Sequence, residues 1–249
     1  MQNREPPPTL DIPMTRSPAS DTSNDGVAAV ERALAIVEAV AQHAQPISLA
    51  DLARATGFYK STLLRLIVSL ERSAMIVRRG DGHYAIGPYA HRLGRAYDHA
   101  YRLTDTIEPL LQELVEAGSE SASFHAYRDA ASRVCLLRVD SHHSTLDRIR
   151  AGDLLPLNKG AAGKLLTAYL VDHASVDQAG LVALSMGERD PNCAAVASPV
   201  FDGAGDMCGA ISLSGPKERF TPKAIRSMSE QVQHAAARAS VALGGAWPA

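Results

Sequence analysis

The sequence predicts an α+β protein in which a small helical module ending in a β-hairpin precedes a larger segment of mixed strands and helices. Apolar residues recur at helical spacing in three stretches before residue 75, and two short strand-like runs around a glycine turn follow. Strand-like and helix-like stretches then alternate towards the C-terminus. Charge is also distributed unevenly along the chain. Residues 27–95 contain nine basic and five acidic residues, whereas residues 96–249 contain 14 basic and 18 acidic residues.

Composition excludes several classes of protein. The net charge of −2 over 249 residues gives no overall sign of a nucleic-acid partner, although a basic module joined to an acidic one can mark such contact. Three cysteines are too few and too scattered for a disulfide framework and suit a reducing cytoplasm. No apolar run approaches the roughly 20 residues of a membrane span, and no signal-peptide pattern is present. We therefore expect a cytoplasmic protein without a membrane partner.

The N-terminal segment divides into a tail and a first helix. Residues 1–25 carry five prolines and lack apolar periodicity, so we expect a disordered tail. A helix is predicted from Val27 to Ala44, with Asn24 or Asp25 as its N-cap. Its apolar residues at helical spacing are Val27, Val30, Leu34, Val37, Val40 and Ala41.

Two more helices follow closely. Ser48 stands three residues before Asp51, which resembles a capping box with Asp in place of Glu, and Gly57 is placed to close this short helix. A third helix is predicted over 60–73. Its apolar stripe consists of Leu63, Leu66, Ile67 and Leu70.

A change to strand-like spacing completes the first module. The runs 75–79 and 83–86 flank Gly80-Asp81-Gly82, which is a tight-turn signal. Three helices followed by a small hairpin is the order of a winged helix-turn-helix. We therefore predict a winged helix-turn-helix DNA-binding domain over 26–87.

The segment after the hairpin is predicted to begin with a linker helix over 88–103, which is also the candidate dimer contact. The helical pattern reaches Ala117 with a break near Thr104. Thr221 and Gly244 are placed to cap a long C-terminal helix. The side chains expected to face a second copy are Tyr89, Leu93, Ala96 and Ala100. The strand candidates are Ala122–Ala126, Val134–Val139, Leu146–Ile149, Ala194–Phe201 and Met207–Leu213, and the helix candidates are Ala161–Leu170 and Thr221–Leu243.

The third helix carries side chains suited to DNA on the face opposite its apolar stripe. The arginine Arg65 can donate two hydrogen bonds to guanine, and Leu64 can contact a thymine methyl group. Ser, Thr and Lys suit phosphates and base edges. The alternative is a small helical bundle with a solvated basic face. The predicted DNA-binding residues are Ser48, Lys60, Ser61, Thr62, Leu64, Arg65, Arg78 and Arg79.

Four motifs, in order over residues 27–243, resemble the IclR-type transcriptional regulators. The first covers the helix-turn-helix, with Lys-Ser-Thr-Leu-Leu-Arg-Leu at 60–66 and Tyr-Ala-Ile-Gly at 84–87. The others are Leu-Pro-Leu-Asn-Lys-Gly-Ala-Ala-Gly-Lys at 155–164, Ala-Ser-Pro-Val-Phe-Asp at 197–202 and Ile-Ser-Leu-Ser-Gly-Pro at 211–216. The resemblance implies a repressor or activator that binds a palindromic operator in double-stranded DNA as a homodimer or homotetramer.

The resemblance also implies that residues 104–249 form a GAF-like effector-binding domain, with a curved antiparallel sheet and a small-molecule pocket. The residues themselves favour an anion: Gly160–Gly163 lie at a predicted helix start, where N–H groups attract negative charge. Ser212 and Ser214 can point to one side of a strand, so a small organic acid would fit. The alternative is that small residues only allow close packing of helix and sheet. The predicted effector-binding residues are Gly160, Ala161, Ala162, Ser185, Cys193, Ser212 and Ser214.

One segment departs from the family pattern. Between Tyr169 and Gly187 the chain is shorter than the family's usual sequence, so the effector domain is expected to be shortened. The main alternative is therefore a regulator whose C-terminal domain only oligomerises.

Catalytic and metal chemistry are not expected, and no cofactor is predicted. His142 and His143 are adjacent and point apart in a strand, so they would need further ligands to hold zinc. Candidates for those ligands are His125, Cys135 and Asp147. An enzyme with an appended helical domain is a remote alternative. Its loose acid/base candidates are Glu188, Asp190 and His142.

Overall fold

The computed structural model describes residues 26–118, 120–141, 149–176 and 180–248, which form two compact units. One unit holds the described residues up to Ala100 and the other those from Tyr101 onward. In the described part of the chain, none of the helices has the length and apolar character to cross a membrane. The predicted tail over 1–25 lies outside the described residues.

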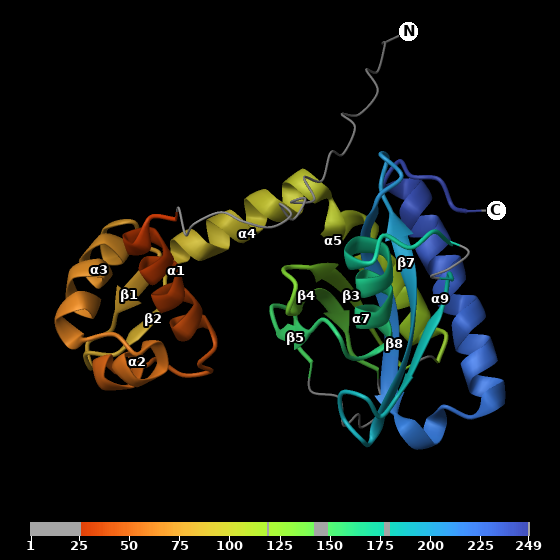
Figure 1. Cartoon of the computed structure of the whole chain (residues 1–249), viewed down its shortest axis with the longest axis horizontal. Coiled ribbons are helices and arrows are strands. Elements are labelled where there is room, and N and C mark those ends of the chain that lie inside the picture. Colours follow the sequence, from red (N-terminus) through yellow and green to blue (C-terminus); the bar gives the residue numbers. More distant parts are fainter. Residues whose placement is uncertain (1–25, 119, 142–148, 177–179, 249) are drawn as a thin grey trace, which may run out of the picture. The chain divides into compact units, whose positions relative to one another are not determined.

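The first unit is a three-helix bundle with a two-stranded wing (Figure 1). The hairpin strands pair antiparallel, with Val77 opposite Ala85. The core is formed by side chains that are at most 1% exposed, namely Ile36, Leu52, Leu63, Ile67 and Ile76. The elements are α1 (Ala28–Ala41), α2 (Leu49–Thr56), α3 (Lys60–Arg72), β1 (Ile76–Arg78), β2 (Tyr84–Ile86) and α4 (Pro88–Tyr101). This is the predicted winged helix-turn-helix.

Helix α1 differs from the prediction in which residues it buries. Its last turns bury Ile36, Ala39 and Val40 against α2 and α3. The first turns extend past this core, so Val27, Val30 and Leu34 of the apolar row are 66%, 55% and 60% exposed. The helix starts after Val27 without a side-chain cap, and the predicted caps Asn24 and Asp25 lie outside the described residues.

Helix α2 is bounded as its sequence predicts. The Ser48 hydroxyl oxygen accepts a hydrogen bond from the Asp51 N–H at 3.2 Å. In a capping box, the acidic side chain accepts a hydrogen bond from the backbone N–H of the capping residue. Here the Asp51 carboxylate instead accepts from the Ser48 hydroxyl at 2.6 Å. Gly57 ends the helix with φ +70°, and its N–H donates to the Ala53 carbonyl oxygen at 2.9 Å.

The second unit is a six-stranded antiparallel sheet with the order β5-β4-β3-β8-β7-β6. Its elements are α5 (Leu103–Thr106), α6 (Glu108–Glu116), β3 (Ser121–Tyr127), β4 (Ser132–Val139), β5 (Leu154–Pro156), α7 (Ala161–Leu166), η1 (Thr167–Val171), β6 (Ala183–Met186), β7 (Cys193–Phe201), β8 (Met207–Pro216), η2 (Lys217–Arg219) and α9 (Pro222–Ala242). This sheet with its flanking helices agrees with the predicted α+β class.

Four of the five strand candidates are strands, and β5 and β6 were not predicted. Of the fifth candidate, 146–148 lies outside the described residues and Ile149 belongs to no strand. The predicted helical break near Thr104 falls at Arg102, which has φ +50°, and a second break follows at Ile107.

The last two helix predictions have different outcomes. The helix at Ala161 is α-helical only to Leu166 and continues as a π-helical turn. The C-terminal helix is capped as predicted, since Thr221 Oγ1 accepts from the Ala224 N–H at 3.3 Å and Gly244 adopts φ +84°.

The two faces of the sheet have opposite character. Residues such as Phe124, Ile211 and Leu213 pack against α6 and α9 and form an apolar core. Their strand neighbours Ser123 and Ser212 stand opposite each other on the other face, where α7 lies (Figure 1). The sheet therefore presents buried polar side chains to α7.

Gly163 is required where α7 meets the strands. A Cβ at this position would lie 2.2 Å from the Leu157 carbonyl oxygen and 2.9 Å from Nη1 of Arg133. We expect Gly163→Ala to lower the free energy of unfolding by about 1–3 kcal/mol, as overpacking does elsewhere. Urea denaturation followed by circular dichroism measures this change.

The matched control is Gly203→Ala in the same unit. A Cβ there meets only the 3.5 Å contact of ordinary packing. Equal effects of the two substitutions would contradict the close packing assigned to Gly163.

Candidate functional site

Helix α3 exposes the residues predicted to contact DNA. Lys60, Ser61 and Arg65 are exposed, Leu64 is 47% exposed, and Thr62 is half-buried. The apolar stripe turns the other way, where Leu63 and Ile67 are fully buried. Val68, 46% exposed, was not predicted on this face; its position one turn beyond Leu64 was the available signal.

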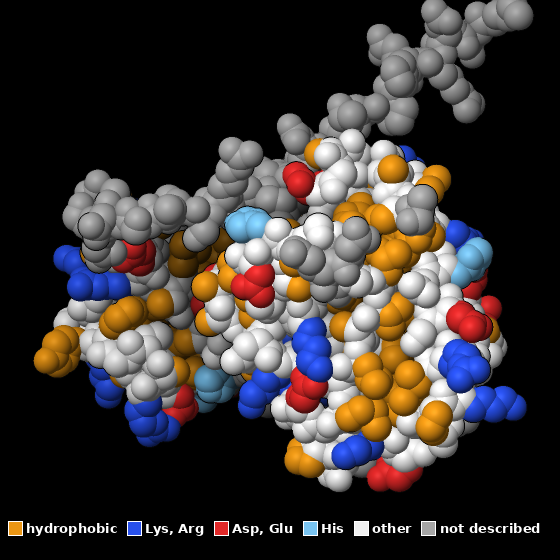
Figure 2. Space-filling model, turned by 45° about the vertical axis from the view of Figure 1, so that its right-hand side comes forward, with side chains coloured by type: hydrophobic (Ala, Val, Ile, Leu, Met, Phe, Trp, Pro, Cys, Tyr) orange, Lys and Arg blue, Asp and Glu red, His pale blue; other side chains and the backbone are white. Residues whose placement is uncertain are grey.

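The wing carries further basic side chains. Arg78 and Arg79 are exposed, and several basic side chains of this unit are visible in Figure 2. The turn between the strands is held by Asp81, which accepts from the His83 N–H at 3.0 Å, and this bond is the main reason why the pKa of Asp81 is lowered. Ser48 is half-buried and its hydroxyl is engaged in the cap of α2.

All seven residues predicted to bind an effector line one cavity in the second unit. The cavity has a volume of about 30 Å³ and lies between α7 and the polar face of the sheet. The structure thus brings together Gly160, Ala161, Ala162, Ser185, Cys193, Ser212 and Ser214 from α7, β6, β7 and β8.

The cavity also contains charged and titratable groups that sequence reasoning missed. His125 on β3 and Arg133 on β4 line it from below α7, and Arg189 and Asp190 line it from the β6–β7 turn. The remaining lining residues are Ile149, Ala194 and Ala195. His125 could have been found from the sequence, because residues two apart on a strand share a face and Ser123 is two positions before it. Nothing in the sequence indicated how β4 pairs with β3, so Arg133 could not have been found.

Arg133 fixes the segment that precedes α7. Its guanidinium is buried, and Nη1 donates to the carbonyl oxygens of Pro156 and Lys159, the latter at 2.8 Å. A Cβ on Gly160 would lie 3.2 Å from Nη2 of Arg133. The guanidinium therefore positions the start of α7 and also borders the cavity.

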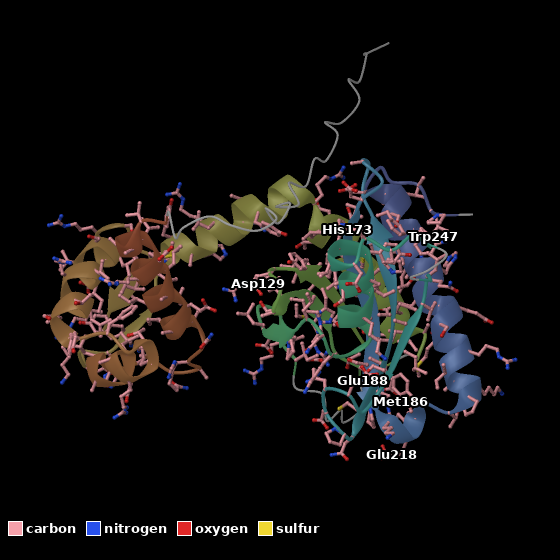
Figure 3. The ribbon with its side chains drawn as sticks, viewed as in Figure 1. Asp129, His173, Met186, Glu188, Glu218 and Trp247 are labelled. Carbon is pink, nitrogen blue, oxygen red and sulfur yellow. The ribbon has the colours of Figure 1, made fainter. Side chains whose placement is uncertain are left out.

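The anion expected at the start of α7 is supplied by the chain itself. The Glu188 carboxylate pairs with Lys164 and accepts from the Gly160 N–H and the Ser185 hydroxyl, and these bonds lower the pKa of Glu188. Glu188 lies near Met186 where β6 ends (Figure 3). The Ser212 hydroxyl donates to the Val196 carbonyl at 3.2 Å. These donors are therefore already used within the protein.

His125 is the buried titratable group of the cavity. Its side chain is 2% exposed, and Nε2 lies 2.9 Å from the Ser123 hydroxyl. Burial lowers the pKa of His125 well below its ordinary value of 6.5, and the cations Arg133, Arg138 and Arg189 lower it further. The imidazole is therefore neutral at physiological pH.

Within the described residues, no three His, Cys, Asp or Glu side chains are grouped as metal ligands would be. His142, His143 and Asp147 lie outside the described part of the chain.

A winged helix-turn-helix with basic side chains exposed on α3, followed by a sheet unit with a polar cavity, is the architecture of a transcriptional regulator. The chain matches the family model for the IclR helix-turn-helix domain over residues 29–80. It also matches the model for the bacterial transcriptional regulator IclR C-terminal domain over 176–241. The chain belongs to the IclR-type transcriptional regulators, which bind DNA and are not enzymes.

Characterised relatives agree with this family. The chain is 28% identical to the HTH-type transcriptional regulator BhcR of Paracoccus denitrificans, over 85% of each chain. It is 24% identical to the acetate operon repressor of Salmonella typhimurium, over 92% of this chain and 96% of that protein.

Solved structures share the fold. A putative IclR regulator from a Silicibacter species superposes with a TM-score of 0.76 at 22% identity, covering 88% of this chain and 98% of that one. An IclR homologue from Microbacterium hydrocarbonoxydans, complexed with 4-hydroxybenzoate, superposes with a TM-score of 0.73 at 16% identity, covering 86% and 98%.

The neutral, buried His125 makes stability depend on pH. The unfolded chain takes up a proton at this residue below about pH 6.5, whereas the folded chain resists it, so folding is favoured above that pH and weakened below it. We expect this residue to remove up to about 1.4 kcal/mol of stability per pH unit below 6.5. Urea denaturation between pH 7.5 and 5 measures the slope.

His125→Asn should flatten this slope, because the amide does not titrate. His173→Asn is the control, since His173 is exposed and its positive φ suits asparagine. An unchanged slope in His125→Asn would show that the imidazole is not buried in its neutral form.

Proposed function

We propose that this chain is a repressor that binds a palindromic operator as a dimer and responds to a small organic acid. The observation that carries the ligand part is the convergence of all seven predicted residues on one cavity that also contains two guanidinium groups. The DNA part is supported by the exposed face of α3. A ligand changes operator affinity only if it binds one of two conformations more tightly.

The N-terminal half of α3 is proposed to read bases in the major groove. Lys60, Ser61 and Arg65 are exposed there, and the first turns of a recognition helix are the part that reaches base edges. Arg78 and Arg79 on the wing are placed to contact phosphates, which fix register without reading sequence.

Arg65→Ala is expected to weaken operator binding by about 1–3 kcal/mol, because a bidentate contact to a base is lost. Gel retardation on a duplex selected from a random pool by the wild-type protein measures the change. Arg72→Ala is the matched control, since Arg72 is exposed on the same helix but in its last turn. Equal losses in the two variants, or none in Arg65→Ala, would contradict the assignment.

The ligand class is proposed from the cavity's charges. Arg133 and Arg189 supply two positive charges against the single carboxylate of Asp190. The family neighbour with 4-hydroxybenzoate shows that an IclR homologue can hold an organic acid. A volume of about 30 Å³ is only two to three times the roughly 10–15 Å³ that a cavity needs to hold one water molecule, so a ligand must be very small or must widen the cavity.

The small volume favours one alternative, a C-terminal unit that only oligomerises. A thermal-shift screen of organic acids separates the two functions, because a specific ligand raises the unfolding temperature by mass action. A screen without any stabilising acid would support the alternative.

The double variant Ser212→Ala, Ser214→Ala is expected to lose at least tenfold in affinity for any acid that stabilises the wild type. The two hydroxyls line the cavity, and the Ser212 hydroxyl would exchange its hydrogen bond to the Val196 carbonyl for one to the ligand, since a hydrogen bond to a charged group is worth about 1.5–3 kcal/mol. Isothermal titration calorimetry measures the loss. Ser240→Ala is the control, because Ser240 is equally buried but does not line the cavity. An unchanged affinity in the double variant would place the ligand elsewhere.

The dimer contact is proposed to include the exposed apolar rows of α1 and α4. Leu34 is 60% exposed, Leu93 is 46% exposed and Tyr97 is 42% exposed. Of the other predicted contacts on α4, Tyr89 is half-buried, and Cζ of Arg92 lies over its ring at 5.4 Å from the ring centre. Ala96 is exposed, and the side chain of Ala100 lies outside the part of the chain that the structure describes. Apolar rows of this kind are typical of protein interfaces.

Leu34→Asp with Leu93→Asp is expected to shift the protein to monomers in analytical ultracentrifugation, because a buried carboxylate without a partner is costly. Leu184→Asp, which changes an exposed leucine on β6, is the control. A dimer that survives the double substitution would place the contact on another surface.

A further inference from the structure

We propose that His125 determines the specificity of the cavity, which selects organic acids that carry a hydroxyl group over those that lack one. This inference rests on the proposed function, in which the cavity receives an organic acid. It adds the chemical group that the acid must present and the side chain that recognises it.

The imidazole of His125 has one nitrogen satisfied and one without a protein partner. Nε2 lies 2.9 Å from the Ser123 hydroxyl, whereas Nδ1 is buried and has no hydrogen-bond partner among the described residues. Across the sheet, His125 stands opposite Ala210 on β8 and Cys135 on β4. Neither side chain is a strong hydrogen-bonding group. Because His125 lines the cavity, we infer that a group bound there is the partner of Nδ1.

The charges around His125 favour an anion as the bearer of that group. Arg133 and Arg189 line the same cavity as the imidazole. The one lining carboxylate, that of Asp190, already accepts from the Asn192 N–H at 2.9 Å. A carboxylate ligand thus finds two cations nearby, while the neutral imidazole offers a hydrogen bond without a charge.

A hydroxyl group matches Nδ1 in either protonation pattern. If Ser123 donates to Nε2, Nδ1 carries the hydrogen and a hydroxyl oxygen can accept from it. If Nε2 donates to Ser123, Nδ1 is an acceptor and a hydroxyl can donate to it. A methyl group in the same place leaves a buried nitrogen unpaired, and such sites discriminate strongly against the analogue that lacks the polar group.

The test compares acids in pairs that differ by one hydroxyl group. Calorimetry on the full-length protein measures glycolate against acetate, lactate against propionate, and 4-hydroxybenzoate against benzoate. We expect the acids that bind to include a hydroxy acid at least about tenfold tighter than its partner. Equal affinities within every pair that binds would overturn this inference and leave the proposed function intact. Binding of none of the six would contradict the organic-acid part of the proposed function, and this inference with it.

Two variants assign the preference to His125. His125→Phe keeps a ring but no nitrogen, and should bring the ratio of affinities within a pair close to one. His125→Asn places an amide near the position of Nδ1 and should keep most of the preference. A full preference in His125→Phe would overturn the assignment.

If the His125→Phe variant does not fold, a measurement on the wild-type protein can still test the inference. In protein labelled with ¹⁵N-histidine, the Nδ1 resonance of His125 is assigned by its absence in His125→Asn. Glycolate should shift this resonance and acetate should leave it unchanged. Equal shifts with both acids would contradict a hydrogen bond to the hydroxyl group.

Discussion

The register between β3 and β4 is the constraint on which the second unit depends. A bulge between Phe124 and His125 shifts the pairing, so that Ser123 stands opposite Arg138 while His125 stands opposite Cys135. In a regular strand, residues three apart such as Cys135 and Arg138 would point to opposite faces. The bulge brings both onto the face beneath α7, together with Arg133.

This polar face is tolerable only because its groups are paired or bordered by the cavity. Buried arginine is costly unless it is hydrogen-bonded, and Nη1 of Arg133 donates to two of the carbonyl oxygens that precede α7. Gly160 and Gly163 let the backbone approach that guanidinium. The opposite face needs no such arrangement, because α6 and α9 cover it with apolar side chains. One sheet thus supplies a stabilising core on one side and the proposed ligand-binding surface on the other.

Local signals in the sequence predicted much of the fold. Ser48, Gly57 and Thr221 mark helix ends by chemistry that acts within a few residues, and the structure confirms all three. Five of the seven cavity residues lie in the family motifs at 155–164 and 211–216, Ser185 and Cys193 were predicted from their nearness to family positions, and the structure places all seven together. The charged members of the cavity could not be found in this way, because Arg133 joins His125 only through the pairing of β4 with β3, and Arg189 joins them through a turn. The short edge strands β5 and β6 were missed because three or four residues carry little periodicity.

The central claim is that the polar face beneath α7 recognises an anionic ligand. Hydrogen exchange followed by mass spectrometry on the full-length protein, with and without saturating glycolate, tests it most directly. The account predicts slower exchange in peptides that contain Gly160–Gly163 and Ser212–Ser214, and loss of this protection in Arg133→Gln. Protection confined to peptides of α6 and α9, on the apolar face of the sheet, would contradict it.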